Sequence, residues 1–155
     1  MTRALLLTLP ALALLAACDQ APKGVDVNRL DAAVGDAVGD PNTCVLLLEK
    51  GGGKVVYRYG THANCGRPLP SCQGEASLSA EALGKLAAAG EVRTISCDSG
   101  PNGENRVAWA SGPAPRSTGA KHGDLVYAAL MEGPGVLPGR EIAIRLEAAL
   151  VKGGL

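Results

Sequence analysis

Five cysteines are spread along a chain of 155 residues whose other side chains offer little bulk for a hydrophobic core. Hydrophobic residues make up 46% of the sequence, but there is no Phe, one Trp and three Tyr. The apolar residues are mainly Ala, Leu and Val, so a core built from them gains from covalent cross-links. The length suits one domain. In an exported protein an odd number of cysteines leaves one without an intramolecular partner.

The charge composition argues against one broad class of partner. Lys and Arg total 15, Asp and Glu also total 15, and the formal net charge is zero. Nucleic-acid binding depends on a basic surface that neutralises phosphates, and this composition supplies no excess of positive charge. We therefore expect no nucleic-acid partner.

The first 17 residues have the layout of an export signal. Arg3 stands in a short amino-terminal region, and residues 4–15 form an apolar stretch that is too short to span a bilayer. The sequence Leu15-Ala16-Ala17-Cys18 then resembles the bacterial lipoprotein signal, in which small residues precede a cysteine that is lipidated and becomes the first residue. The alternative is an ordinary signal peptide with a cysteine nearby.

The lipoprotein resemblance implies a location. Several acyl chains on Cys18 would anchor the protein stably in a membrane, facing the periplasm of the bacterial cell envelope. Residues 18–24 are polar and contain Pro and Gly, so they suit a tether that holds a domain of residues 25–155 close to that membrane. Asp19 resembles the signal that keeps enterobacterial lipoproteins in the inner membrane, which favours the inner over the outer membrane.

Removing Cys18 from the count leaves an even set of cysteines in an oxidising compartment, which predicts two disulfides. Four cysteines allow three connectivities, and the sequence alone does not choose among them. A zinc site is disfavoured because no Cys-x-x-Cys pair occurs and the two histidines do not fall at zinc-finger spacing. We expect no metal and no cofactor. The four cysteines are Cys44, Cys65, Cys72 and Cys97.

Hydrophobic periodicity and turn residues predict an α+β domain with a single antiparallel sheet of about five strands. Asp26 and Ser79 are the expected N-caps of the first two helices, and Gly51 to Gly53 is a hairpin turn. Residues 61–74 are expected to be an irregular cross-linked loop. The expected elements are a helix at 27–38, strands at 44–49 and 54–59, a helix at 79–89, strands at 91–97, 106–110 and 125–131, and a closing helix that carries Ile142 to Leu150 and ends before Gly153.

A few large or charged side chains are candidates for a binding surface. Strand alternation predicts that Tyr57 and Tyr59 share one face with Val55, most simply the packed face. Trp109 is a further aromatic that a ligand could contact. The loop residues Arg67, Arg116 and Lys121 could form a small basic patch, although solvated loop charge is the default interpretation. His62 is expected in the cross-linked loop, and His122 is expected to be solvated beside Lys121.

Several segments at both ends of the domain carry a family resemblance: the hairpin from Cys44 to Tyr59, the following Asn64 to Cys72, the strand Arg106 to Gly112, and the closing pair Val126 to Leu130 and Pro138 to Glu141. Together these segments resemble class D serine β-lactamases, which have a penicillin-recognising fold. The element order also looks like the profilin-like and roadblock folds.

The catalytic motifs of that family are not matched. The family places a nucleophilic Ser three residues before a Lys, where this chain has Gln73-Gly74-Glu75-Ala76. The Lys-Thr-Gly strand motif would fall on Asp98-Ser99-Gly100. The span from Ala76 to Val92 is too short for the family's helical domain. The resemblance therefore implies a retained sheet without the catalytic residues.

The resemblance also implies a disulfide pattern. Cys44 would pair with Cys65 at neighbouring ends of the hairpin, and Cys72 would pair with Cys97 beside the lost active site. The rival pattern, Cys65 with Cys72 and Cys44 with Cys97, stays open.

These observations predict a membrane-anchored, non-catalytic binding or interaction module, whose partner would be an envelope protein or a ligand related to the cell wall. Ser71, Ser99 and Trp109 are the residues that could contact such a ligand. One alternative is a residual serine hydrolase, or a penicillin-interacting protein, that uses Ser71 or Ser99. Another is a profilin-like or roadblock-like scaffold that docks an envelope protein.

Overall fold

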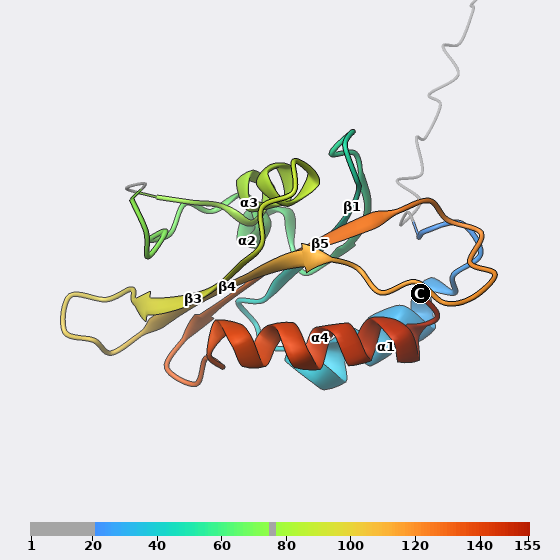
Figure 1. The fold of residues 1–155 in the computed structure, drawn as a ribbon. Coiled ribbons are helices and arrows are strands. Elements are labelled where there is room, and N and C mark those ends of the chain that lie inside the picture. The colour runs from blue at the N-terminus through green and yellow to red at the C-terminus, as the bar shows by residue number, and fades with distance from the viewer. Residues whose placement is uncertain (1–20, 75–76) are drawn as a thin grey trace, which may run out of the picture.

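A computed structural model describes residues 21–74 and 77–155, which form a five-stranded antiparallel sheet with helices on both faces (Figure 1). This is the α+β class that the sequence predicts. The signal peptide, Cys18 and Asp19 lie outside the described residues. Within the described residues, no helix is both long enough and apolar enough to cross a membrane.

The order of elements along the chain matches the prediction except for one added short helix. Strand β2 follows β1 as a hairpin, β3, β4 and β5 pair one after another, and β1 pairs with β5 to join the two groups in the order β2-β1-β5-β4-β3, with β2 and β3 at the edges. The elements are α1 (Val27–Val38), β1 (Cys44–Glu49), β2 (Val55–Tyr59), α2 (His62–Gly66), α3 (Ala80–Ala88), β3 (Arg93–Asp98), β4 (Arg106–Pro113), β5 (Leu125–Gly133) and α4 (Gly139–Gly153).

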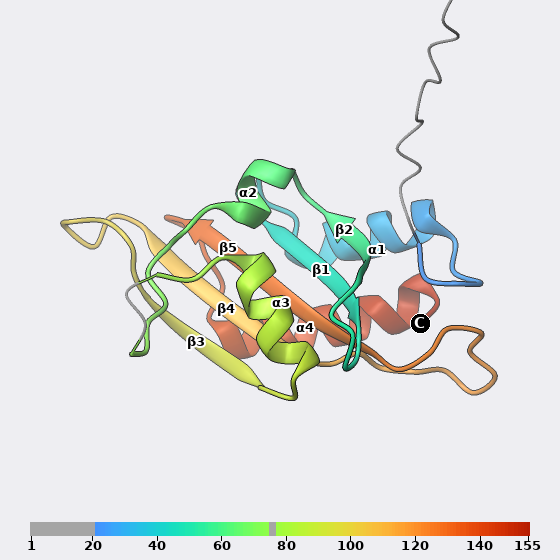
Figure 2. The same ribbon diagram turned by 90° about the horizontal axis from the view of Figure 1, so that it is seen from above.

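The helices divide between the two faces of the sheet. Helices α1 and α4 lie against one face, and α3 with the short α2 lies against the other (Figures 1 and 2). Strand β5 therefore alternates between two cores: Tyr127 and Ala129 pack with α1 and α4, whereas Ala128 and Leu130 pack with α3. Because both faces are covered, the central strands β1 and β5 are almost continuously apolar.

Local capping signals place the helices where the sequence predicts them. The Asp26 carboxylate accepts hydrogen bonds from the backbone N–H groups of Asn28 and Arg29, at 2.9 and 3.2 Å, and begins α1. The Ser79 hydroxyl accepts a bond from the N–H of Ala82 at 3.1 Å and begins α3. Both side chains satisfy backbone donors that the first helical turn leaves unpaired.

The expected irregular loop at 61–74 contains the short helix α2, so that prediction was wrong for its first part. Thr61 begins the helix by accepting a hydrogen bond from the N–H of Asn64 at 3.1 Å. The N-cap signal is present in the sequence, but the prolines and cysteines that follow favoured a loop. The helix carries Cys65 inward against β1.

The predicted common face of Val55, Tyr57 and Tyr59 was also wrong. The register between β1 and β2 shifts at a β-bulge, so that Leu47 lies opposite Tyr57 while Leu48 lies opposite Val55. A bulge inserts one extra residue and reverses the alternation on one side of it. Tyr57 and Tyr59 therefore pack on the α1 and α4 face, and Val55 packs on the α3 face.

Helix α4 meets the sheet through a glycine at its first position. The Gly139 N–H donates a hydrogen bond to the Ser96 hydroxyl at 3.0 Å. A Cβ at residue 139 would lie 2.5 Å from the backbone oxygen of Trp109 and 2.6 Å from the backbone nitrogen of Ile95. Both contacts are with backbone atoms of the sheet, so the helix can dock this closely only without a side chain.

We expect Gly139→Ala to lower the free energy of unfolding by about 2–3 kcal/mol, because the methyl group must displace the helix from the sheet. Gly135→Ala is the matched control, since a Cβ there would have no atom within 4 Å and the backbone does not require glycine. That control should change stability by less than about 0.5 kcal/mol. Urea denaturation followed by circular dichroism measures both, and equal stabilities would contradict the close docking of α4.

Two buried tyrosines connect the sheet to the helices on the same face. The Tyr57 hydroxyl donates to the Asp31 carboxylate of α1 at 2.7 Å, and the Tyr127 hydroxyl donates to the Glu147 carboxylate of α4 at 2.9 Å. Burial, and then the hydrogen bond to the carboxylate, raise the pKa of both phenols far above the usual value. The folded protein therefore keeps two protons that the unfolded chain releases at high pH.

We expect the free energy of unfolding to fall as the pH rises above about 10, the pKa of a tyrosine in an unfolded chain. A raised folded-state pKa stabilises the protein at lower pH, and the contribution is lost as the pH approaches the folded-state value. The double variant Tyr57→Phe/Tyr127→Phe should lose less stability over this range than the parent chain. Denaturation curves at a series of alkaline pH values make the comparison, and identical slopes would contradict the assignment.

Candidate functional site

The structure contains two disulfides, Cys44–Cys65 and Cys72–Cys97, the pairs that the β-lactamase resemblance implies. Their Cα atoms are 5.2 and 5.5 Å apart, and the paired residues are separated by 21 and 25 positions in the chain. Each loop of this length contributes about 3 kcal/mol in the chain-entropy model. Cys44–Cys65 is fully buried between β1 and α2, whereas both cysteines of Cys72–Cys97 are partly exposed.

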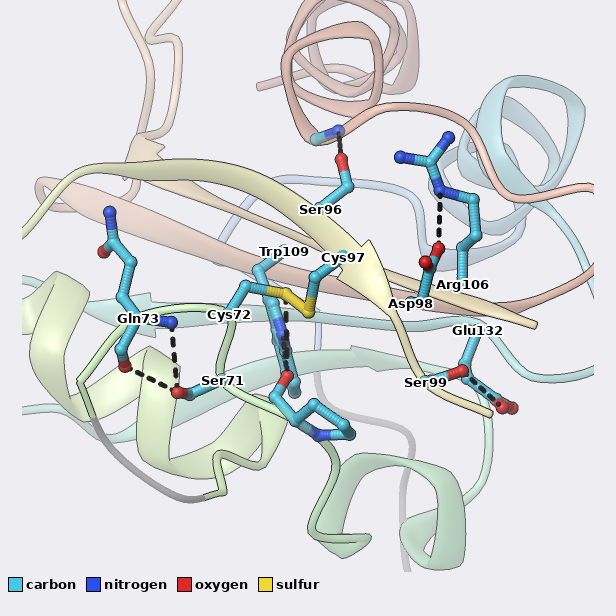
Figure 3. Close-up of a disulfide and its surroundings, with 12 residues drawn as sticks. Ser71, Cys72, Gln73, Ser96, Cys97, Asp98, Ser99, Arg106, Trp109 and Glu132 are labelled. Atoms are coloured by element: carbon cyan, nitrogen blue, oxygen red, sulfur yellow. Dashed lines mark hydrogen bonds and ion pairs between the residues drawn. A yellow bond between two sulfur atoms is a disulfide. The ribbon is translucent and has the colours of Figure 1, made fainter. Parts of the chain in front are cut away.

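The candidate ligand residue Ser71 lies beside the exposed disulfide (Figure 3). Its hydroxyl donates a hydrogen bond to the backbone oxygen of Gln73 at 2.6 Å and accepts one from the Gln73 N–H at 3.3 Å. A backbone carbonyl cannot remove the hydroxyl proton, so this bond does not activate Ser71 as a nucleophile. The next residue, Cys72, has φ of +65°, a left-handed conformation that is unusual for a non-glycine residue.

Ser99 lies on the other side of the same disulfide in Figure 3. Its hydroxyl donates to the Glu132 carboxylate at 3.3 Å, and Arg67 forms an ion pair with the other oxygen of that carboxylate at 2.9 Å. The three side chains connect the loop after α2, the end of β3 and the end of β5. Arg67 is therefore part of this network and does not form a patch with Arg116 and Lys121.

Trp109 is completely buried beneath the loop that carries Ser71. Its indole N–H donates to the backbone oxygen of Pro70 at 2.8 Å (Figure 3). The ring belongs to the core on the α3 face, so its faces contact protein atoms. In this structure Trp109 supports the loop and the disulfide and offers no exposed surface for stacking a ligand.

A pocket of about 520 Å³ lies at the opposite end of the sheet. Its walls come from the N-terminal segment 21–23, the end of β1 with the β1–β2 turn, and the loop between β4 and β5. A smaller pocket of about 180 Å³ adjoins it and shares Lys50 and His122. In Figures 1 and 2 the N-terminal segment and the β4–β5 loop lie at the end away from the β3–β4 turn.

His122 borders both pockets and is only 7% exposed. Its Nδ1 lies 3.0 Å from the backbone oxygen of Gly123, an acceptor, so Nδ1 carries the proton in this contact. Nε2 is buried and has no hydrogen-bond partner within the part of the chain that the structure describes. The expectation of a solvated His122 was therefore wrong, because the folded protein covers nearly all of the residue.

Cationic residues line the same pockets as this histidine. Lys23, Lys50 and Lys121 line the larger pocket, and none of them forms an ion pair with a carboxylate among the described residues. Arg116 lines the smaller pocket and pairs with Asp124 at 2.9 Å. Glu49 is the other carboxylate that lines the larger pocket.

Sequence reasoning missed this site because its parts lie far apart in the chain. Lys121 and Arg116 stood out as loop cations, but nothing local indicates that Lys23 and Lys50 lie beside them. Two hydrogen bonds hold the β4–β5 loop in place: the Lys50 N–H donates to the backbone oxygen of Asp124 at 3.0 Å, and the Ser117 side-chain hydroxyl donates to the backbone oxygen of Leu155. Within the described residues, no three His, Cys, Asp or Glu side chains gather as they would around a metal ion.

No protein-family model, no curated protein and no solved structure matches this chain.

The two disulfides should differ in their reactivity. A reductant must reach a sulfur atom, so mild phosphine treatment of the folded protein should open Cys72–Cys97 before Cys44–Cys65. Alkylation of the freed thiols followed by peptide mass spectrometry should recover labelled Cys72 and Cys97 first, by roughly tenfold or more in rate. In urea, where both are accessible, the rates should converge. Faster opening of Cys44–Cys65 in the folded state would contradict the burial described above.

Proposed function

We propose that this chain is a bacterial envelope lipoprotein, anchored through Cys18, whose folded domain is a non-catalytic binding module. The observation that carries the proposal is the pocket beside His122, which opens next to residues 21–23. These residues follow the lipidation signal almost directly, so the pocket and the anchor belong to the same end of the protein. The inner membrane is the favoured location because of Asp19.

The absence of matched catalytic motifs supports a binding role. The positions that correspond to the Ser-x-x-Lys and Lys-Thr-Gly motifs hold Gln73 to Ala76 and Asp98 to Gly100. Ser71, which lies closest to the first of these, donates a hydrogen bond to the backbone oxygen of Gln73. The proposal retains the view that the sheet is a reduced, catalytically inactive relative of the penicillin-recognising fold.

A residual serine hydrolase is the second candidate, favoured by one specific contact. The Ser99 hydroxyl lies 3.3 Å from the Glu132 carboxylate, and a carboxylate can accept a proton from a nucleophile. Arg67 holds that carboxylate at 2.9 Å. This geometry ties Glu132 into an ion pair, which suits a structural role better than proton transfer.

We expect a chain expressed with its own signal in a diderm bacterium to incorporate labelled palmitate, and its mature amino terminus to be acylated Cys18. Cys18→Ser should abolish the label, because the thiol is the acceptor of the diacylglycerol. Asp19→Ala is the matched control and should remain labelled. In-gel detection of palmitate and mass spectrometry of the amino-terminal peptide report the result. An unlabelled parent chain whose mature form begins at another residue would contradict the anchor.

The hydrolase alternative is tested on the same membranes. We expect a fluorescent penicillin to leave this protein unlabelled, since no activated serine is proposed. Covalent labelling that is lost in Ser71→Ala or in Ser99→Ala would contradict the non-catalytic proposal. Turnover of activated esters that survives both substitutions would assign that activity to a contaminant.

A further inference from the structure

We propose that the pocket beside His122 binds the phosphate group of an anionic phospholipid in the membrane that carries the anchor. The inference rests on the proposed anchoring through Cys18. Its ligand is defined by chemistry: a negatively charged phosphate at the level of the lipid headgroups, received by three lysines and a buried imidazole.

The charge around the pocket suits an anion. Lys23, Lys50 and Lys121 come from three separate segments and meet at one cavity without a carboxylate partner among the described residues. Asp124 and Glu49 line the cavity as well; Asp124 is engaged by Arg116, so three lysines stand against one carboxylate, Glu49, that no ion pair among the described residues neutralises. A phosphate bound between the three ammonium groups would gain attraction from each, and each remains close enough to solvent to adjust its position.

His122 provides the second, independent observation. A buried polar atom without a hydrogen bond is costly, and Nε2 is such an atom in a residue that is 7% exposed. The bond from Nδ1 to Gly123 orients the ring and leaves Nε2 as its unpaired nitrogen, buried in a residue that borders both pockets. With Nδ1 donating to Gly123, the neutral ring presents a lone pair at Nε2, so a phosphate oxygen would bind there together with a proton that makes Nε2 a second donor.

The walls of the pocket are held together before any ligand binds. Gly24, with φ of +86°, turns the N-terminal segment so that the aliphatic stem of Lys121 packs against it, 3.2 Å from the position of a hypothetical Cβ. The backbone bond from Lys50 to Asp124 connects the β1–β2 turn to the same loop. The three segments that supply the lysines are thus fixed relative to one another, which lowers the entropic cost of binding.

The position of the pocket close to Cys18 in the chain favours the phosphate of a lipid headgroup over a soluble phosphate as the ligand. Asp19 and Gln20 alone separate Cys18 from Ala21, which lines the pocket. Three extended residues span at most about 11 Å, only a few ångströms more than the roughly 5–8 Å thickness of the headgroup region on one side of a bilayer. An acylated Cys18 would therefore hold the pocket within reach of the headgroups at a very high local concentration.

The test uses the processed lipoprotein, purified from membranes and reconstituted into nanodiscs. One set of discs contains phosphatidylcholine alone, and the other also contains phosphatidylglycerol. Brief acetylation followed by peptide mass spectrometry measures the reactivity of each lysine. We expect Lys50 and Lys121 to be acetylated roughly fivefold more slowly in the anionic discs. Lys85, an exposed residue of α3, is the internal reference and should react equally in both.

Two variants distinguish binding of a headgroup in the pocket from general electrostatic attraction between the lysines and the anionic bilayer. The side-chain amide of His122→Asn can still donate to Gly123 but leaves nothing at the position of Nε2, so it should abolish most of the protection at Lys50 and Lys121. Lys50→Gln, a surface change with little effect on folding, should weaken the protection of Lys121 by roughly fivefold. Lys85→Gln is the control with the same loss of charge and should change nothing.

Each outcome decides one question. Equal acetylation of Lys50 and Lys121 in both kinds of disc, with lipid confirmed on Cys18, would overturn the headgroup site and leave the anchor intact. The site would also be overturned if Lys50 and Lys121 were still fully protected from acetylation in a folded His122→Asn variant. It would be overturned as well if the protection of Lys121 from acetylation were unchanged in Lys50→Gln. Protection by inorganic phosphate in phosphatidylcholine discs would make the site one for soluble phosphate. A protein without lipid at Cys18 would instead refute the proposed function.

Discussion

The burial of β1 and β5 from both faces is the constraint on which the rest of the structure depends. Helices α1 and α4 cover one side and α3 covers the other, so neither strand has a solvent face. The small side chains at Ala128 and Ala129 of β5 let the helices approach closely. Gly139 shows the limit of this approach, because α4 begins against the backbone of the sheet. A core of such modest side chains owes its stability to close packing.

The two ends of the sheet are held by different means. At one end, two disulfides attach α2 and the following loop to β1 and β3. At the other end, a backbone hydrogen bond from Lys50 to Asp124 joins the β1–β2 turn to the β4–β5 loop, and the N-terminal segment contacts the same loop where Gly24 lies against Lys121. The cross-linked end holds the serines and Trp109 in structural contacts. The end without cross-links holds the exposed lysines and His122, where a binding site has room to adapt.

Local signals explain most of what could be predicted about the fold. Asp26 and Ser79 cap their helices as expected, and the three glycines after β1 turn the chain into β2. The wrong predictions concern the face on which a strand residue lies and the presence of a short helix, which local sequence signals did not settle. The face on which Val55 lies depends on a β-bulge that arises from the pairing of β2 with β1. The short helix α2 was not predicted because the prolines and cysteines that follow Thr61 favoured a loop.

The sequence by itself determined the sheet class, the order of the elements apart from α2, and the even set of four cysteines that follows Cys18, because these depend on periodicity, turn residues and composition. The tertiary structure alone decided what surrounds His122. Its burial and its lysine neighbours come from segments near residues 22, 50 and 120, which the antiparallel sheet brings to one end. A local sequence pattern does not predict that these three segments lie together, since their proximity depends on the register of β1 on β5 and on the conformation of the β4–β5 loop.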